Sequence, residues 1–376
     1  DEYSSINHSK AMFEYDFNDE ETYAGNAISA FLKATQLNPS DSLENLCQLF
    51  SLLFALKNSK DLVDSLFNEI LKLPVVHLSN IIPQLASNID HPDLLIRNLI
   101  HKLIIDIGRK DFQSIYFPLS LYSSSDNKTK SSIAKCLINK LIPKNQSIFE
   151  ECELLSDGLK RSAITWFESW LHSIELMSKA QRANNYNLIK KYLEEKFEEY
   201  QNPKCALDDL FIKVHGGAVQ ELIEMYKNNS PQIWGVLRNL YKRLKEETER
   251  LSIILLSKVS EKLNDKRDFL IYSPGFEEKV NIDYIETRMD IMNTKQKPRI
   301  VNIVLTNGKI RKYLLKGNED LRLDERFMQF FSLINGFFFK NRKSIELNMS
   351  INRYSIVPLS QNVGLIQWIT GADTIH

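Results

Sequence analysis

The sequence predicts a mainly helical protein that ends in an α+β domain. Through the first two thirds of the chain, apolar residues recur at three- and four-residue spacing, which is typical of amphipathic helices. After about residue 268, short runs of β-branched and aromatic residues replace this pattern, and an Asn-Gly turn joins two of them. We therefore expect a helical-repeat solenoid, then a four-helix bundle insert, then a small lobe that contains a sheet and one long helix.

Composition sets the limits of function. The chain has 376 residues, of which 43% are hydrophobic and 26% charged, as in ordinary globular proteins. Lys+Arg and Asp+Glu number 48 each, so no net field favours direct binding of nucleic acid. No apolar run reaches about eighteen residues, so we expect no membrane span. Because the chain does not begin with Met, we expect a fragment of a longer protein.

Metal and disulfide chemistry are not expected. The four cysteines are scattered along the chain, and no CxxC pair is present. No histidine falls at metal-ligand spacing from a cysteine or carboxylate on one predicted face. The sequence therefore predicts no metal site and a reducing compartment.

Residues 1–157 are expected to form the solenoid. Leu46, Leu49 and Leu53 share one face of a predicted helix, and similar faces recur up to about residue 160. Residues 93–108 form a single predicted helix, with Pro92 in its first turn. Breakers separate the helices at 38–40, 73–74, 91–92, 123–126 and 143–145. This spacing suits paired helices that stack on one another.

Residues 158–260 are expected to form the bundle. Four helices are predicted, near 158–181, 184–200, 205–228 and 230–260. Trp166 and Trp170 are four residues apart and therefore share one helix face. Two interpretations stay open for them: they pack in the core, or they line a docking groove for a ligand or partner.

Residues 261–376 are expected to form the small lobe. The Thr-Asn-Gly-Lys sequence at 306–309 is a strong hairpin signal, because Asn-Gly tolerates the positive φ of such turns. A long helix is predicted at about 321–340. The expected strands lie at 269–272, 282–285, 300–305, 310–315 and 354–359, and a further apolar strand lies at 364–369.

Lys316 is the candidate chemical group of this lobe. It ends a strand whose neighbours are apolar, so it needs a partner charge, and Glu319 and Asp324 follow at the start of the next helix. A strand lysine held by such an acidic partner fixes the phosphates of ATP in kinases. The alternative is a surface lysine near a helix start.

The strand at 364–369 runs into a Thr-Gly turn and carries Trp368. An aromatic ring beside free backbone amides is what an adenine site requires. The alternative is an ordinary core tryptophan. No Gly-rich phosphate loop and no Ser/His/Asp arrangement is present.

Several segments resemble one family. Residues 315–330 (LKGNEDLRLDERFMQF) resemble the signature of phosphatidylinositol 3-kinase-related protein kinases, and residues 348–368 resemble the target-of-rapamycin branch. Residues 99–109 and 115–119 resemble the solenoid (FAT) of that branch. Residues 163–170 and 233–243 resemble the first and last helices of its rapamycin-binding (FRB) insert. Residues 323–326 and 366–368 are closer to the nonsense-mediated-decay kinase, the alternative within the superfamily.

The resemblance implies roles for individual residues. Lys316 contacts the phosphates of ATP, with Glu319 and Asp324 as its acidic partners, and Thr294 lies in the phosphate loop. Mg²⁺ is implied together with ATP, and its ligands and the catalytic loop are expected beyond His376, so the segment alone is expected to be inactive. The adenine pocket, the hinge and the pocket mouth are assigned to Leu314, Tyr354, Ile366, Trp368, Ile369 and Thr374.

The resemblance also implies partners. The parent is a cytoplasmic serine/threonine protein kinase of growth and nutrient signalling, with protein substrates and complex subunits as partners, and endomembranes and the nucleus are further implied compartments. A groove ligand or partner is expected at Trp166, Trp170, Ser178, Trp234 and Tyr241. Arg182 and Arg238 stand where rapamycin-sensitive members have aromatic residues. A pseudokinase scaffold and a lipid kinase are the remaining alternatives.

Overall fold

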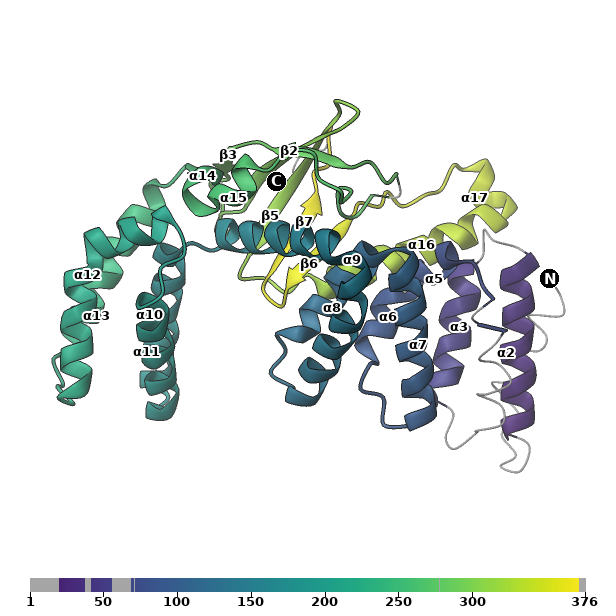
Figure 1. Cartoon of the computed structure of the whole chain (residues 1–376), viewed down its shortest axis with the longest axis horizontal. Coiled ribbons are helices and arrows are strands. Elements are labelled where there is room, and N and C mark those ends of the chain that lie inside the picture. Colours follow the sequence, from purple (N-terminus) through teal and green to yellow (C-terminus); the bar gives the residue numbers. More distant parts are fainter. Residues whose placement is uncertain (1–19, 38–41, 56–68, 71, 277, 372–376) are drawn as a thin grey trace. The chain divides into compact units, whose positions relative to one another are not determined.

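The computed structural model describes residues 20–37, 42–55, 69–70, 72–276 and 278–371 (Figure 1). It divides into two compact units. One contains Asp1–Cys152 and Leu321–Gln361, and the other contains Glu153–Asp320 and Asn362–His376. The α+β lobe predicted from the sequence is therefore shared between the units.

The helices of the first unit follow the predicted solenoid pattern. Leu46, Leu49 and Leu53 are fully buried, as their spacing predicts. Asp93 caps α7 by accepting hydrogen bonds from the amides of Leu95 and Ile96, at 2.8 and 3.1 Å. Pro92 therefore precedes this helix. The prediction that it lies in the first turn is wrong. The helices are α2 (Glu20–Leu37), α3 (Ser42–Ala55), α5 (Val75–Leu78), η2 (Ser79–Ile81), α6 (Ile82–Ser87), α7 (Leu94–Lys110) and α8 (Phe112–Ser123).

Helix α9 (Lys128–Ala163) corrects one predicted boundary and bears out another. The predicted break at 143–145 falls at a kink between two helical halves, where Asn145 has non-helical φ −134° and ψ 26°. The helix then continues to Ala163, so residues 158–163 end α9 and do not begin the first helix of the bundle.

The first unit also contains α16 (Arg322–Lys340), α17 (Arg342–Glu346) and the strand β6 (Ile356–Ser360). This helix and strand confirm the predicted elements at 321–340 and 354–359. Polar contacts join α16 to the solenoid helices: Gln329 Nε2 donates to the Asn80 carbonyl at 2.8 Å, and Lys340 Nζ lies 3.0 Å from the Glu44 carboxylate.

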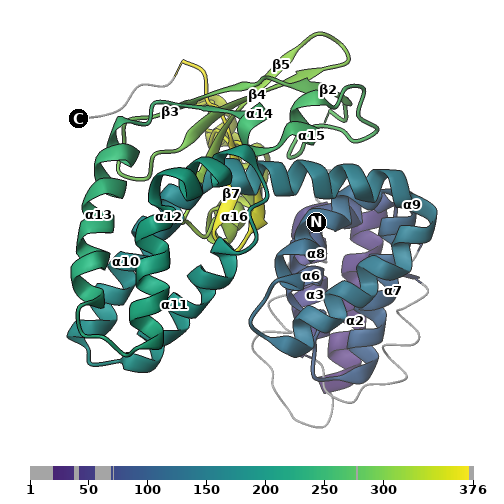
Figure 2. The same ribbon diagram turned by 60° about the vertical axis from the view of Figure 1, so that its left-hand side comes forward.

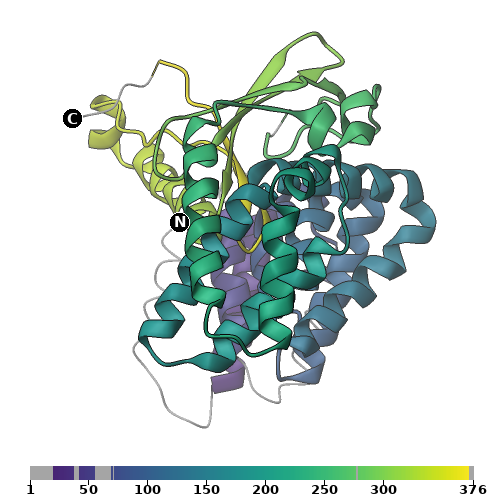
Figure 3. The ribbon, with the colours of Figure 1, turned by 90° about the vertical axis from the view of Figure 1, so that its left-hand side faces the viewer.

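The bundle of the second unit comprises α10 (Trp166–Arg182), α11 (Tyr186–Tyr200), α12 (Ala206–Lys227) and α13 (Ile233–Arg250), shown in Figure 3. Its core is aromatic. Trp170 is fully buried and stacks on Phe211 with ring centroids 5.7 Å apart, and Trp166 meets the same ring edge-on at 5.8 Å. The core interpretation of Trp166 and Trp170 is therefore right, and their placement in an open groove is wrong.

The sheet of the second unit is antiparallel and runs in the order β1, β3, β4, β5, β7, while β2 pairs with β4 (Figure 2). Its strands are β1 (Ile253–Leu255), β2 (Ile282–Ile285), β3 (Arg288–Ile291), β4 (Arg299–Leu305), β5 (Ile310–Gly317) and β7 (Val363–Gln367). Two short helices, α14 (Leu256–Val259) and α15 (Glu261–Asp265), follow β1.

Several predictions about this sheet can be compared with the structure. The hairpin is confirmed: Gly308 has φ +77°, and its amide donates to the Leu305 carbonyl at 2.8 Å. The predicted strand at 269–272 does not form a regular strand, but it pairs with the chain around the start of β2: a bridge joins Tyr272 to Asn281, and the Phe269 amide donates to the Ile282 carbonyl at 2.9 Å. Strands β1 and β3 were not predicted, and α13 ends at Arg250, about ten residues before its predicted end at 260.

No helix in the described ranges combines the length and the apolar character needed to cross a bilayer.

Candidate functional site

Strand β5 presents one buried and one half-buried face. Arg311, Tyr313 and Leu315 are buried, whereas Leu314 and Lys316 are only half-buried. Because successive side chains of a strand alternate in direction, the two half-buried residues share the more open face.

The neighbouring strands extend this face. Leu314 pairs with Ile300 of β4 on one side and with Ile366 of β7 on the other, and all three side chains are half-buried. Gly364 lies opposite Lys316 on β7, so no β7 side chain stands across from the lysine. The result is a partly open apolar row, which we call the open face, with a cation at its end.

Lys316 has the acidic partner that the sequence predicted. Its Nζ lies 2.9 Å from a carboxylate oxygen of Glu319, and the two side chains are 26% and 28% exposed. Asn318 between them adopts a left-handed conformation, with φ +60°, which turns the chain after β5. The Glu319 amide donates to the Asn362 carbonyl at 3.2 Å, which fixes the turn next to β7. The pair is partly desolvated and still open to a ligand.

Gly317 ends β5 in a crowded position. A Cβ atom there would lie 2.7 Å from the Ala163 carbonyl oxygen and 2.6 Å from a side-chain carbon of Ile164. The strand that carries Lys316 therefore lies directly against the end of α9, and only glycine fits without a shift.

Trp368 corrects one expectation about the adenine site. Its amide donates to the Lys312 carbonyl at 2.9 Å, so this amide is not free for a ligand. The Lys312 ammonium lies 4.1 Å from the centroid of the Trp368 ring, a cation–π contact. Ile369, the next residue, is 51% exposed. The tryptophan is therefore a half-buried residue at the edge of the open face, and Ile369 is accessible.

Thr294 lies in the turn between β3 and β4. The Met292 amide donates to the Pro298 carbonyl at 2.9 Å, and the Lys297 amide donates to the Thr294 carbonyl at 3.1 Å. Residues 293–296 are exposed. We call residues 292–298 the β3–β4 turn.

The remaining predicted site residues lie elsewhere. Asp324 is exposed in the first turn of α16, and Tyr354 precedes β6, so both belong to the other compact unit. Their roles stay predictions. Thr374 lies outside the described residues.

The open face combines apolar groups with one paired cation. An apolar row beside a paired lysine offers a surface for a base and a cation for phosphate oxygens. Among the residues with a described position, no three His, Cys, Asp or Glu side chains gather as metal ligands would.

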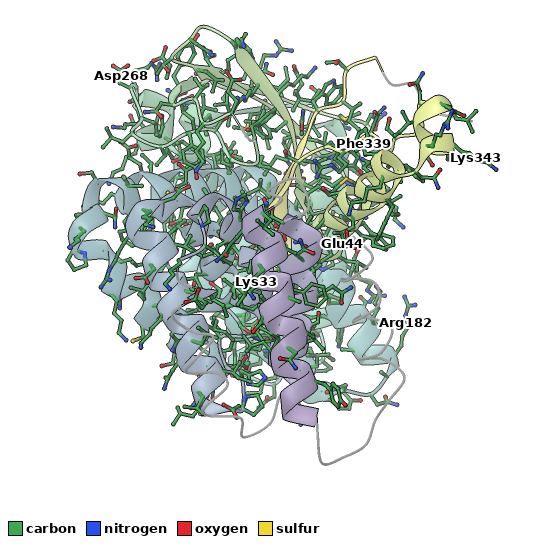
Figure 4. The ribbon with its side chains drawn as sticks, turned by 90° about the vertical axis from the view of Figure 1, so that its right-hand side faces the viewer. Lys33, Glu44, Arg182, Asp268, Phe339 and Lys343 are labelled. Atoms are coloured by element: carbon green, nitrogen blue, oxygen red, sulfur yellow. The ribbon has the colours of Figure 1, made fainter. Side chains whose placement is uncertain are left out.

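The bundle surface shows where the predicted groove residues lie. Ser178 and Trp234 are half-buried, and the Tyr241 hydroxyl donates to the Glu175 carboxylate at 3.1 Å. Arg182, labelled in Figure 4, is exposed at the end of α10. Arg238 is exposed on α13, where its Nε donates to the Trp234 carbonyl at 3.2 Å.

Sequence reasoning missed one buried ion pair. Arg299 of β4 is only 2% exposed, and its guanidinium pairs with the Glu168 carboxylate in the first turn of α10. Thr165 and Glu168 form a capping box, a pattern that can be read directly from a Thr-x-x-Glu sequence. The signal for a helix start at Thr165 was therefore present, but nothing local pointed to Arg299.

Comparison with known proteins matches two parts of the chain to family models. The model for phosphatidylinositol 3- and 4-kinase matches residues 311–376, which include most of β5 with Lys316 and Glu319. The model for the FKBP12-rapamycin binding domain matches residues 158–246, which include the bundle helices up to the last turn of α13.

Whole-chain relatives agree with these matches. The serine/threonine-protein kinase mTor of Drosophila melanogaster is 30% identical over 369 residues, covering 94% of this chain and 15% of the relative. The kinase tor1 of Schizosaccharomyces pombe is 27% identical, covering 95% of this chain and 16% of the relative. The chain thus spans about 15% of the length of the curated relatives it matches.

A solved structure supports the fold. The FAT and kinase domain of CtTel1 superposes with a TM-score of 0.55 at 15% identity, covering 93% of this chain and 20% of that one. The similarity extends across the helices and the sheet, so the predicted mainly α fold followed by an α+β lobe is confirmed.

The two family models and the whole-chain relatives together identify a segment of the phosphatidylinositol 3-kinase-related kinase class. Within that class the chain is of the target-of-rapamycin type, as its sequence predicted. The alternative branch is represented by the SMG1 kinase of Danio rerio, which is 22% identical over 89% of the chain.

Proposed function

We propose that this chain supplies the nucleotide-binding small lobe, with its helical supports, of a target-of-rapamycin-type serine/threonine protein kinase. The parent protein transfers the γ-phosphate of ATP to protein hydroxyls and works with other protein subunits. One observation carries the proposal: the Lys316–Glu319 pair stands at the end of a partly open apolar row, inside the segment that the kinase family model matches.

In this proposal each part of the open face has a separate task. Ile300, Leu314 and Ile366 pack against the base and exclude water from it. Lys316 Nζ donates to phosphate oxygens, while Glu319 holds the ammonium in place when no ligand is bound. Mg²⁺ would enter together with ATP and would supply neutralisation of the phosphate charge.

We further propose that residues 1–376 alone have no phosphoryl-transfer activity. The open face supplies one side of a nucleotide site, and no metal-ligand cluster occurs among the described residues. We therefore expect residues 1–376 alone to bind Mg-ATP weakly and to phosphorylate nothing. Isothermal calorimetry and a radiolabel transfer assay test this, and micromolar binding by the segment would contradict it.

Lys316→Met in the full-length kinase is the direct test of the site. The change removes the cation and keeps most of the side-chain volume. We expect turnover to fall at least about a hundredfold, a typical loss when one charge-stabilising donor is removed. Lys309→Met is the matched control, because Lys309 is exposed in the β4–β5 turn. A folded Lys316→Met kinase with wild-type turnover would refute the site.

A further inference from the structure

Arg299 makes a two-sided contact from inside the second unit. Its Nη1 donates to the Lys297 carbonyl at 2.5 Å, within the β3–β4 turn. Its Nη2 pairs with the Glu168 carboxylate of α10. Among the described residues its Nε has no hydrogen-bond partner, so the side chain depends on these two contacts. One guanidinium therefore joins the turn to the bundle.

Glu168 is itself fixed at the start of α10. Its carboxylate accepts hydrogen bonds from the amide and the hydroxyl of Thr165, at 3.0 and 2.9 Å. This carboxylate is only 14% exposed and lies in the first turn, where the helix dipole favours negative charge. Arg299 is thus attached to a rigid helix start.

Lys297 provides a second attachment, to the last helix of the bundle. Its Nζ donates to the Thr248 carbonyl in the last turn of α13. Its backbone has φ +46°, a left-handed conformation that costs free energy for a lysine and persists only when surrounding contacts enforce it. The stretch 297–299 is therefore held by the start of α10 and by the end of α13.

The turn has few contacts of its own. Three backbone hydrogen bonds form within it, donated by the amides of Met292, Thr294 and Lys297, and residues 293–296 are exposed. A short exposed turn can hold an anion in a fixed geometry only if its ends are fixed in advance.

We propose that Arg299 is a positioning residue for phosphate binding, which acts by anchoring the β3–β4 turn to the helical bundle through Glu168. This inference rests on the proposed function, because it assigns the turn a role in holding ATP. It also gives the bundle a role inside the kinase lobe, separate from any ligand on the bundle surface.

Hydrogen–deuterium exchange of the whole chain tests the anchoring without nucleotide. In Arg299→Met and in Glu168→Gln, we expect the hydrogen-bonded turn amides, those of Met292, Thr294 and Lys297, to exchange at least about tenfold faster, because the turn loses its anchor. The double variant should exchange no faster than Arg299→Met, since both changes remove the same contact. Arg288→Met is the control: Arg288 is exposed on β3 and pairs with Asp290 at 2.8 Å, so its loss should leave the turn unchanged.

Two features keep this test decisive if Arg299→Met does not fold. Glu168→Gln retains a side-chain oxygen for the Thr165 cap, and Arg299→Lys retains the buried charge while losing the fork-shaped guanidinium. In both variants the β5–β7 amides should stay protected while the turn exchanges faster. Turn exchange within twofold of the wild type in these folded variants would overturn the proposal.

Kinetics of the full-length kinase supply the second readout. For Glu168→Gln we expect the KM for ATP to rise at least about fivefold, with kcat within about twofold, because the turn positions ground-state phosphate. A purely structural role would lower kcat through loss of active protein and leave KM unchanged, and that result would overturn the proposal. The two proposals fail differently: wild-type turnover in Lys316→Met refutes the site, whereas unchanged exchange in the turn refutes only the anchor.

Discussion

Gly317 shows how closely one residue can control the position of a functional side chain. It follows Lys316, and a Cβ atom there would lie 2.7 Å from the Ala163 carbonyl oxygen, a backbone atom that cannot rotate away. We expect Gly317→Ala to lower the free energy of unfolding by about 2 kcal/mol, as overpacking does. Urea denaturation followed by tryptophan fluorescence measures the change.

Gly235→Ala is the matched control in the same unit. A Cβ atom at Gly235 meets nothing within 4 Å, and the residue lies in α13. We expect this change to be neutral or to stabilise by on the order of 0.5 kcal/mol, because alanine favours a helix more than glycine does. Equal effects of the two substitutions would show that the contact with α9 does not constrain β5.

Glu325 on α16 predicts a pH dependence. Burial raises the pKa of this carboxyl to about 7, and the charge of Arg326 opposes the rise. Since the folded state holds the proton more tightly than the unfolded chain, stability is full below about pH 4.5 and falls as pH rises to about 7. Arg322, Arg326 and Asp90 are the other charged groups near this site, because they act together with Glu325 on the pKa of Tyr122.

Glu325→Gln should remove this dependence. At pH 8 we expect the variant to be more stable by about 2 to 3 kcal/mol, and at pH 4.5 to be nearly equal to the wild type. Urea denaturation at the two pH values measures this. Glu346→Gln is the control, because that side chain is 59% exposed beside Arg342. A Glu325→Gln variant that is less stable at pH 8 would show that the charged form makes favourable contacts.

At the scale of residues, the sequence predicts side-chain pairs that lie close together along the chain. Glu319 follows Lys316 by three residues across a tight turn, so the two could be paired from their spacing. Arg299 and Glu168 are 131 residues apart, and only the folded chain brings them together. A search for apolar periodicity assigns charged residues to the surface, so it does not predict a buried arginine in a strand.

Among the elements, the bundle carries the sharpest prediction. Arg182 and Arg238 are exposed on α10 and α13, near the half-buried Ser178 and Trp234 in sequence. An apolar ligand that covers these sites would have to desolvate the guanidinium groups and would lack two aromatic contacts. We expect binding of the rapamycin–immunophilin complex to be weaker by a hundredfold or more than for a bundle with aromatic residues there, roughly 3 kcal/mol.

The double change Arg182→Phe, Arg238→Tyr should restore binding, and surface plasmon resonance of both bundles against the complex measures it. Arg243→Tyr is the control, because Arg243 is an exposed arginine of the same helix. Nanomolar binding by the unmodified bundle would contradict the expectation, and failure of the double change would show that other positions control affinity.

Element boundaries were the weakest sequence-based predictions, for physical reasons. The breaker at 143–145 does interrupt α9, as a kink at which Asn145 leaves the helical region and its side chain donates to the Leu141 carbonyl at 2.9 Å. The end of the second half at Ala163 was not predicted. Strands β1 and β3 contain three and four residues, too few to show a period of two, and they are stabilised by pairing with each other. Long amphipathic helices and the Asn-Gly hairpin were predictable because their signals are local.

For the whole molecule, the ion pair between bundle and sheet predicts that one substitution has two different effects. In the complete chain, Glu168→Gln leaves Arg299 buried without its partner charge, and we expect a loss of about 3 kcal/mol. In residues 165–250 expressed alone, Arg299 is absent, so we expect a loss below about 1 kcal/mol, that of a weakened helix cap.

Denaturation of both proteins, each with and without the substitution, measures the difference. The isolated bundle should unfold cooperatively, because all residues of the core around Trp170 and Phe211 come from the bundle helices themselves. Trp170 provides the signal, since its ring is fully buried. Equal losses in the two proteins would mean that Glu168 acts through the cap alone.

The polar contacts of α16 with solenoid helices have a consequence for protein engineering and for evolution. Gln329 binds the Asn80 carbonyl, and Lys340 pairs with Glu44, so residues more than two hundred positions apart share one compact unit. An expression boundary placed before the bundle would keep the whole α+β lobe in the sequence and yet remove the surface on which its long helix rests. Trimming such a chain to the segments that the family models match would therefore separate α16 from the solenoid helices with which it forms one compact unit.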